Sequence, residues 1–145
     1  MAQLSSQNFS NYVRRDPLFH FFLMPVFAIS VVASFVHLYR RPGLHSAWTT
    51  IVMIAALVAV LKIRSYALKV QDRVIRLEER LRLMTLLDAA MRPRIGELTE
   101  EQLVALRFAS DGELPGMAVR ALNEKLGGME IKKAIREWRG DYWRV

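Results

Sequence analysis

The sequence predicts an all-α protein: a transmembrane helical hairpin, a second helix extended into the cytoplasm, and a small C-terminal helical bundle. Within residues 18–61 only Arg40 and Arg41 are charged, whereas the rest of the 145-residue chain is densely charged. A soluble domain spreads its charges more evenly, because each surface element needs a polar face. Residues 47–91 also contain no proline or glycine, which favours one long helix there.

The first membrane segment is expected at residues 18–39, a run without Asp, Glu, Lys or Arg. Twenty-two helical residues extend about 33 Å, enough for a hydrocarbon core of about 30 Å. Thirteen of them are Leu, Ile, Val or Phe, which outweighs the cost of His20, Pro25 and His37. A signal peptide is the competing interpretation, but its apolar region is shorter.

The second membrane segment is expected at residues 47–63. Its charge-free part is only 15 residues, 47–61, and alone would suit a buried helix. Beside the first segment we expect it to span, with Lys62 and Arg64 reaching the interface. In the short link between the segments, Pro and Gly break the first helix and Ser46 is expected to cap the second.

The short link makes the two segments antiparallel neighbours, so both termini lie on one side. Arg14, Arg15 and the cations that follow the second segment outnumber the two arginines of the link. The positive-inside rule then places both termini in the cytoplasm. The expected divisions are an N-terminal cytoplasmic segment (1–17), the hairpin (18–63), a juxtamembrane amphipathic helix (64–91) and a C-terminal helical tail (92–145).

One line of apolar residues on the juxtamembrane helix has the alternating spacing of a coiled coil. Its members, the predicted self-association residues, are Ala67, Val70, Val74, Leu77, Leu81 and Met84. The pattern covers about two and a half heptads, fewer than a secure coiled-coil prediction needs. Arg73 at g and Glu78 at the next e would suit a parallel dimer, and the pairs Asp72–Arg76 and Glu78–Arg82 would stabilise the helix itself.

Leu68, Ile75 and Leu86 form a second apolar line on the same helix. Two lines suggest two contacts, one with another copy of the helix and one with the tail. Packing of both lines on the chain's own tail is equally compatible with the pattern. A basic amphipathic helix lying along lipid headgroups is a third possibility.

Three short helices are expected in the tail, over residues 100–109, 114–126 and 129–138. Thr99 and Gln102 form a capping-box pattern at the first, and Gly127-Gly128 is expected to end the second. The predicted core residues are Leu103, Leu106, Met117, Val119, Leu122, Leu126, Ile131, Ile135 and Trp138. So small a bundle needs the long helix as a fourth wall. Interleaved aromatics and arginines over 138–145 are expected to seal this bundle, or alternatively to anchor a partner or lie at a membrane interface.

The positive charge is concentrated beside the membrane. Residues 62–82 carry seven basic and three acidic side chains, whereas residues 92–145 carry ten and nine. Anionic lipid headgroups attract such a juxtamembrane cluster, so the predicted lipid and interface residues are Arg14, Arg15, Lys62, Arg64, Lys69 and Arg73. The near-neutral tail argues against nucleic-acid binding, although its three helices resemble a helix-turn-helix.

Chemistry-bearing motifs are few. The chain has no cysteine, which excludes disulfides and thiolate metal sites, and no catalytic signature appears. His20 and His37 are weak cofactor-binding candidates, because ionisable groups in membranes are often functional. They lie seventeen residues apart, about 25 Å along one helix, so they cannot share one metal or haem. We expect no enzyme activity, no cofactor and no metal.

Several segments resemble a family of small bacterial membrane proteins of uncharacterised function. The resemblance covers most of the chain and rests on Gln7-Asn8-x-x-Asn11, Pro17-x-x-His20-Phe21-x-x-x-Pro25, Arg64-x-Tyr66-Ala67-x-x-Val70-Gln71-Asp72-Arg73-x-Ile75-Arg76-x-Glu78-Glu79-Arg80, Leu98-Thr99-x-x-Gln102 and Asp141-Tyr142-Trp143-Arg144-Val145. It implies the hairpin-plus-tail plan and a bacterial source, and it carries no activity, substrate or catalytic residue.

The leading hypothesis is a non-enzymatic inner-membrane protein that self-associates or is an accessory subunit of a larger membrane complex. Its expected partners are membrane lipids, other copies of itself or other membrane subunits, and not nucleic acid. Two alternatives stay open: a redox or transport accessory using His20 or His37, and a sensor of anionic lipid surfaces built on residues 62–82.

Overall fold

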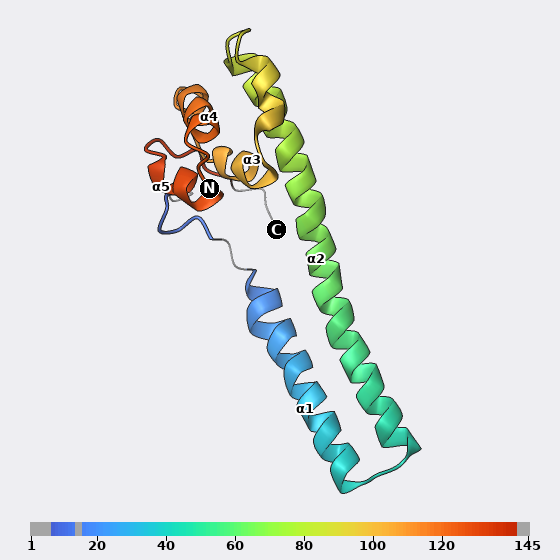
Figure 1. The fold of residues 1–145 in the computed structure, drawn as a ribbon. Coiled ribbons are helices and arrows are strands. Elements are labelled where there is room, and N and C mark those ends of the chain that lie inside the picture. Colours follow the sequence, from blue (N-terminus) through green and yellow to red (C-terminus); the bar gives the residue numbers. More distant parts are fainter. Residues whose placement is uncertain (1–6, 14–15, 142–145) are drawn as a thin grey trace. The chain divides into compact units, whose positions relative to one another are not determined.

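A computed structural model describes residues 7–13 and 16–141 of the chain. Its elements are η1 (Leu18–Leu23), α1 (Met24–Arg40), α2 (Leu44–Leu86), η2 (Arg92–Glu97), α3 (Glu100–Leu106), α4 (Leu114–Asn123) and α5 (Gly128–Ala134) (Figure 1). The described residues form helices and no strand, apart from one isolated bridge between Ala109 and Trp138. The predicted all-α class is therefore confirmed.

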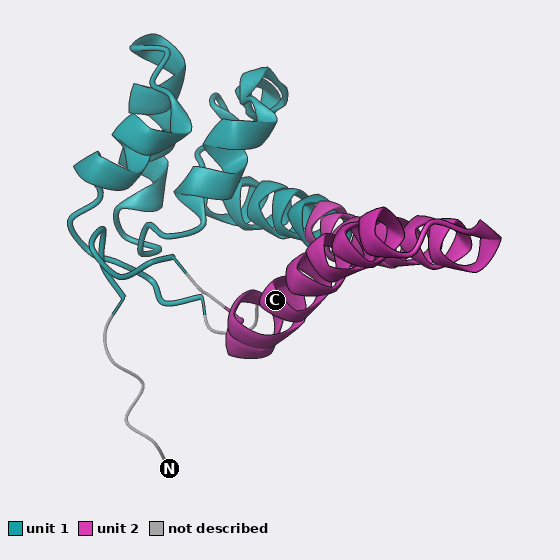
Figure 2. Ribbon diagram, turned by 90° about the horizontal axis from the view of Figure 1, so that it is seen from below, with its two compact units in different colours: residues 1–14, 70–144 teal, residues 15–69, 145 magenta. Residues whose placement is uncertain are grey.

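The chain divides into two compact units, one of residues 1–14 and 70–144 and the other of residues 15–69 (Figure 2). In the second unit α1 and the first part of α2 form an antiparallel hairpin. Both helices are long and apolar enough to cross a membrane, and almost none of either apolar stretch is buried. These helices are therefore not the buried core of a larger domain, because core helices hide their apolar side chains.

Small hydroxyl side chains form the contact inside the hairpin. Ser34 of α1 and Thr50 of α2 are both buried, and the Thr50 hydroxyl donates to the Ser34 carbonyl oxygen at 3.2 Å. The same hydroxyl lies 3.0 Å from the carbonyl oxygen of Ser46, one turn earlier on its own helix. Small residues allow two helix backbones to approach closely, so this pair sets the point where α1 meets α2.

The first long apolar helix begins as a wider π-turn because of Pro25. Proline has no N–H and its ring crowds the carbonyl one turn earlier. The Met24 N–H accordingly donates to Phe19, five residues back, and regular α-helix begins at Met24. The sequence predicted a helix here and did not predict this local change of pitch.

Ser46 is not the cap of the second helix, contrary to the prediction. The Ala47 N–H already donates to the Gly43 carbonyl at 3.0 Å, so α2 begins at Leu44. The Ser46 hydroxyl instead donates to the carbonyl oxygens of Arg41 at 2.7 Å and Gly43 at 3.0 Å. It therefore fastens the link to the helix from inside the first turn.

The long helix ends at Leu86, five residues before the predicted end near Met91. Leu87 is buried, and its N–H still bonds one turn back into the helix, to the Leu83 carbonyl at 2.9 Å. The Arg92 side chain then donates to the Leu87 carbonyl at 3.0 Å, which satisfies a free carbonyl at the helix end. Turning back here lets Ile95 of η2 join the same core as Leu87.

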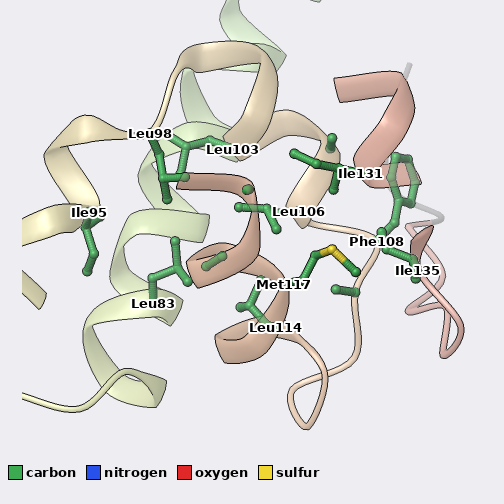
Figure 3. Close-up of a cluster of buried hydrophobic side chains, with 14 of the residues drawn as sticks. Leu83, Ile95, Leu98, Leu103, Leu106, Phe108, Leu114, Met117, Ile131 and Ile135 are labelled. Carbon is green, nitrogen blue, oxygen red and sulfur yellow. The ribbon is translucent and has the colours of Figure 1, made fainter. Parts of the chain in front are cut away.

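The tail helices pack against the last turns of α2, as predicted (Figure 3). Leu83 and Leu87 supply the fourth wall, and the largest fully buried side chains are Phe108, Leu83, Leu103, Leu106, Leu114 and Ile131. Val119 was wrongly placed in the core, where Ala118 and Ala121 lie instead. Alanine was overlooked because its small side chain contributes little to an apolar pattern.

The boundaries of the tail helices follow from their caps. Thr99 and Gln102 form the predicted capping box, with Gln102 N–H to Thr99 Oγ1 at 3.2 Å and Thr99 N–H to Gln102 Oε1 at 2.9 Å. The predicted end of α4 at Gly127-Gly128 is wrong, because α4 ends at Asn123, whereas Gly127 is the N-cap of α5 and Gly128 its first residue. A Cβ on Gly128 would lie 2.7 Å from the Glu101 side chain, so this glycine permits α3 and α5 to approach.

The N-terminal segment packs on the tail core. The Tyr12 ring lies 5.8 Å from Phe108 and 6.0 Å from Trp138, measured between centroids. Trp138 also packs on Phe108 at 5.0 Å, which confirms that this tryptophan seals the bundle. Tyr142 and Trp143 lie outside the described residues. The sequence did not indicate that a residue so far from the tail would complete its core.

Candidate self-association surface

The two apolar lines on α2 differ in burial. In the second line Ile75 is buried and Leu86 packs against the tail core, whereas Leu68 is half-buried. In the first line Val70, Leu77 and Leu81 are each about 60 % exposed. The interpretation that both lines pack on the chain's own tail is therefore wrong, and the first line faces away from the tail.

We call this exposed first line the α2 seam. It comprises Val70, Val74, Leu77, Leu81 and Met84. Ala67, the sixth predicted member, is half-buried. In heptad terms the seam occupies positions a and d, whereas the tail covers the b, c and f positions at Ile75, Leu83 and Glu79. Because these positions lie across the helix from a and d, the tail leaves the whole seam open.

Arg76 and Arg82 both join α2 to the tail, and neither forms the pair along the helix that the sequence predicted. The predicted Asp72–Arg76 pair is wrong, because Arg76 forms an ion pair with Glu100 and its Nε donates to the Asp72 backbone carbonyl. The predicted Glu78–Arg82 pair is also wrong. Besides groups of α2 itself, these two side chains bind Glu100, Asp111 and the Ala109 carbonyl, which only the folded tail brings close.

Arg82 is the central group of this network. Its guanidinium donates to Asp111 at 2.6 Å, to the Ala109 carbonyl at 2.7 Å and to Glu79 at 3.1 Å. Charge-assisted bonds of this kind are about twice as strong as neutral ones. Because Ala109 and Asp111 both lie in the loop between α3 and α4, Arg82 fixes that loop against α2.

Glu79 is a buried carboxyl that the sequence reasoning missed. Burial raises the pKa of Glu79 above 4.5, while Arg82 and Arg139 act in the opposite direction. Its spacing of four residues from Ile75 and from Leu83 could have identified it, since those three positions share one helix face. We attribute to Glu79 a structural role in docking the tail on α2.

A cleft of about 670 Å³ lies between α2 and the segments around Arg107 and Arg139. Its lining residues are Ile75, Glu78, Glu79, Leu81, Arg82, Arg107, Asp111, Arg139, Gly140 and Asp141. Leu81 belongs to the seam, so the cleft borders the seam directly. The apolar seam and the charged cleft together form one continuous candidate surface.

The predicted lipid and interface residues are placed as follows. Lys62 and Lys69 are exposed, and Lys62 lies over the Tyr66 ring at 5.9 Å. Arg64 lies 4.5 Å from the Phe19 ring centroid and 3.8 Å from the Asp16 carboxylate, so it links α2 to the start of the first helix. Arg73 is exposed. Arg14 and Arg15 lie outside the described residues.

The two candidate histidines are not brought together. The His20 Nδ1 lies 2.8 Å from the Asp16 backbone carbonyl, and its ring meets Phe19 edge-on. His37 is exposed near the other end of α1. Over residues 7–13 and 16–141 no group of three or more His, Asp or Glu side chains is arranged to hold a metal ion.

Comparison with known proteins gives a family match, which covers the whole chain. A model of a family of unknown function, DUF6526, matches residues 1–145. The chain belongs to this family. The resemblance seen in the sequence is thus confirmed as membership of an uncharacterised family. No curated protein and no solved structure matches the chain, so membership of the family brings no activity, ligand or partner with it.

Proposed function

We propose that this protein is embedded in the bacterial inner membrane by its hairpin and self-associates through the α2 seam. It has no enzymatic role in this proposal. The observation that carries it is the exposure of the seam on a helix whose opposite face is covered by the tail. A helix of a soluble monomer seldom leaves so regular an apolar stripe in water.

Exposure of the hairpin's apolar side chains supports the membrane location. Phe21 on η1, Ile29 and Val32 on α1 and Ile51 on α2 are all more than half exposed. Each would be unfavourable in water by about 1.5–3 kcal/mol relative to burial. A bilayer removes this cost, because its hydrocarbon core is as apolar as these side chains.

The way the chain enters and leaves the folded tail unit supports an even number of membrane crossings by the chain. The chain leaves this unit near residue 14 and returns near residue 70, so the intervening hairpin has to start and end on the same side. Arg40 and Arg41 are the only charged residues of the link, while the larger cluster lies at 62–82. The positive-inside rule therefore puts the tail and both termini in the cytoplasm.

Membrane attachment also supports association through a short seam. Two and a half heptads form a weak coiled coil in solution. Confinement to one membrane raises the effective concentration of each copy for the other, so weak contacts suffice. Copies inserted with the same topology present the seam in parallel.

Cysteine crosslinking in native membranes tests this proposal, since the chain has no cysteine. Single variants Val70→Cys, Leu77→Cys and Leu81→Cys are expected to form disulfide-linked dimers under mild oxidation. Asp72→Cys is the matched control, because Asp72 is exposed on the other side of the same helix. Dimers that form equally at position 72, or at no position, would overturn the proposal.

A photocrosslinking amino acid at position 77 separates self-association from an accessory role. An adduct of twice the chain mass supports self-association. Adducts only with a different protein would show that the seam binds another membrane subunit, which contradicts the proposal.

A further inference from the structure

We infer that the charged cleft beside the α2 seam is completed by Arg73 of a second, parallel copy, which pairs with Glu78. This inference rests on the proposed self-association and deepens it, because it names the orientation, the register and the residues that select the partner.

The cleft has one carboxylate more than it has cations. Its lining contains Glu78, Glu79, Asp111 and Asp141 and the arginines Arg82, Arg107 and Arg139. Three of the four carboxylates are paired within the chain: Glu79 and Asp111 with Arg82, and Asp141 with Arg107 at 3.4 Å. Within the part of the chain that the structure describes, Glu78 alone of these four forms no ion pair. The cleft therefore offers one acceptor for a cation from outside.

Pairing of two copies along the seam would bring Arg73 of one copy next to Glu78 of the other. Arg73 is exposed and, among the described residues, forms no ion pair. Arg73 and Glu78 occupy opposite flanks of the seam, positions g and e, so they do not meet on one helix. In a parallel pair, g of one helix faces e of the next heptad on the other. Arg73 of each copy thus faces Glu78 of the other.

An antiparallel pair would lose this match. It brings g positions against g positions, which are Arg73 and Arg80 in this chain, and like charges oppose each other there. In the parallel register Arg80 faces Thr85, which carries no charge. Arg73 and Glu78 therefore specify the register of the parallel pair, while Arg80 has no charged partner in that pair and acts only against the antiparallel one.

Charge reversal in the Leu77→Cys background tests the inference in membranes. Arg73→Glu and Glu78→Arg, each alone, are expected to lower disulfide-linked dimer about fivefold, because each places two like-charged pairs across the seam. The double variant R73E/E78R is expected to restore the dimer, since the opposite charges again face each other. Arg80→Glu, the matched control, is expected to leave the yield unchanged.

Co-expression of the two single variants with tags of different size gives a second readout. The mixed dimer has two attractive pairs and each single-variant dimer has two repulsive ones, so the mixed form is expected to exceed random pairing by about fivefold. Random pairing, with crosslinking at position 77 intact, overturns the Arg73–Glu78 register and leaves self-association standing. Absence of crosslinking in the unreversed Leu77→Cys protein overturns self-association itself.

Discussion

The side chain of Gln7 and the backbone of Asp141 exchange two hydrogen bonds across 134 residues. Gln7 Nε2 donates to the Asp141 carbonyl at 3.3 Å, and the Asp141 N–H donates to Gln7 Oε1 at 2.9 Å. The Gln7 side-chain amide thus both donates to and accepts from the backbone of one residue, as a backbone amide does in a paired strand. The N-terminal segment and the end of the tail are thereby fastened to each other in one folded unit.

The N-terminal segment is expected to contribute to the stability of the tail unit. Tyr12→Ala should lower the free energy of unfolding by about 1–3 kcal/mol, because it removes a ring that contacts Phe108 and Trp138. Gln7→Ala should cost about 1 kcal/mol through its lost hydrogen bonds. Urea titration of the detergent-solubilised protein, followed by tryptophan fluorescence, measures both. No loss of stability in Tyr12→Ala would contradict this role.

The two faces of α2 can be separated by a matched pair of leucines. Leu83 is fully buried, whereas Leu81 is 60 % exposed. Leu83→Ala is expected to lower the free energy of unfolding by about 2–4 kcal/mol, because it opens a cavity in the core. Leu81→Ala is expected to change it by less than about 0.5 kcal/mol and to reduce dimer crosslinking at position 77. Equal destabilisation by the two substitutions would show that the faces are not distinct.

Glu79 makes the stability of the tail unit depend on pH. Its pKa in the folded state is raised above 4.5 by burial, so above that pH the folded state holds more protons than the unfolded state. Stability from Glu79 is then fully present below about pH 4.5 and falls as pH rises through the folded pKa. The difference in unfolding free energy, wild type minus Glu79→Gln, should therefore decrease as the pH rises above about 4.5.

Glu124 supplies a control of opposite sign for the pH experiment. A hydrogen bond from Arg120 lowers the pKa of Glu124 below 4.5, so its contribution is present above that value and lost as pH falls. Because this pair is exposed, solvent screens it and the effect of Glu124→Gln should be small. A difference for Glu79→Gln that rises with pH would contradict the assignment of burial as the main cause.

The hairpin contact is expected to be sensitive to volume at Ser34. Ser34→Leu should weaken the hairpin, because a larger side chain forces apart the backbones at the Ser34–Thr50 contact at a cost of about 1–3 kcal/mol. Ala33→Leu is the control, since Ala33 is exposed on the outer side of α1. Disulfide formation between Ser30→Cys and Met53→Cys, compared in the two backgrounds, measures helix proximity; equal yields would rule out close packing at Ser34.

Local pattern alone predicted several elements of this protein. The run without charge over 18–39 predicts the first long helix, because helix length and transfer free energy depend only on residues in that run. Thr99 and Gln102 predict the start of α3, because a capping box is completed within four residues. The fourth wall was also predictable, since three short helices cannot bury enough apolar area by themselves.

Only the tertiary structure decided which apolar line of α2 the tail would cover. Ile75 and Leu77 are equally apolar and equally placed for burial by local spacing, yet Ile75 is buried and Leu77 is exposed. Which line is buried depends on the volume and charge of the tail segments that dock on α2. The hydrogen bonds of Arg82 to Ala109 and Asp111 hold the tail on the Ile75 side of the helix. Such contacts join residues far apart in the chain, and a local periodicity carries no information about them.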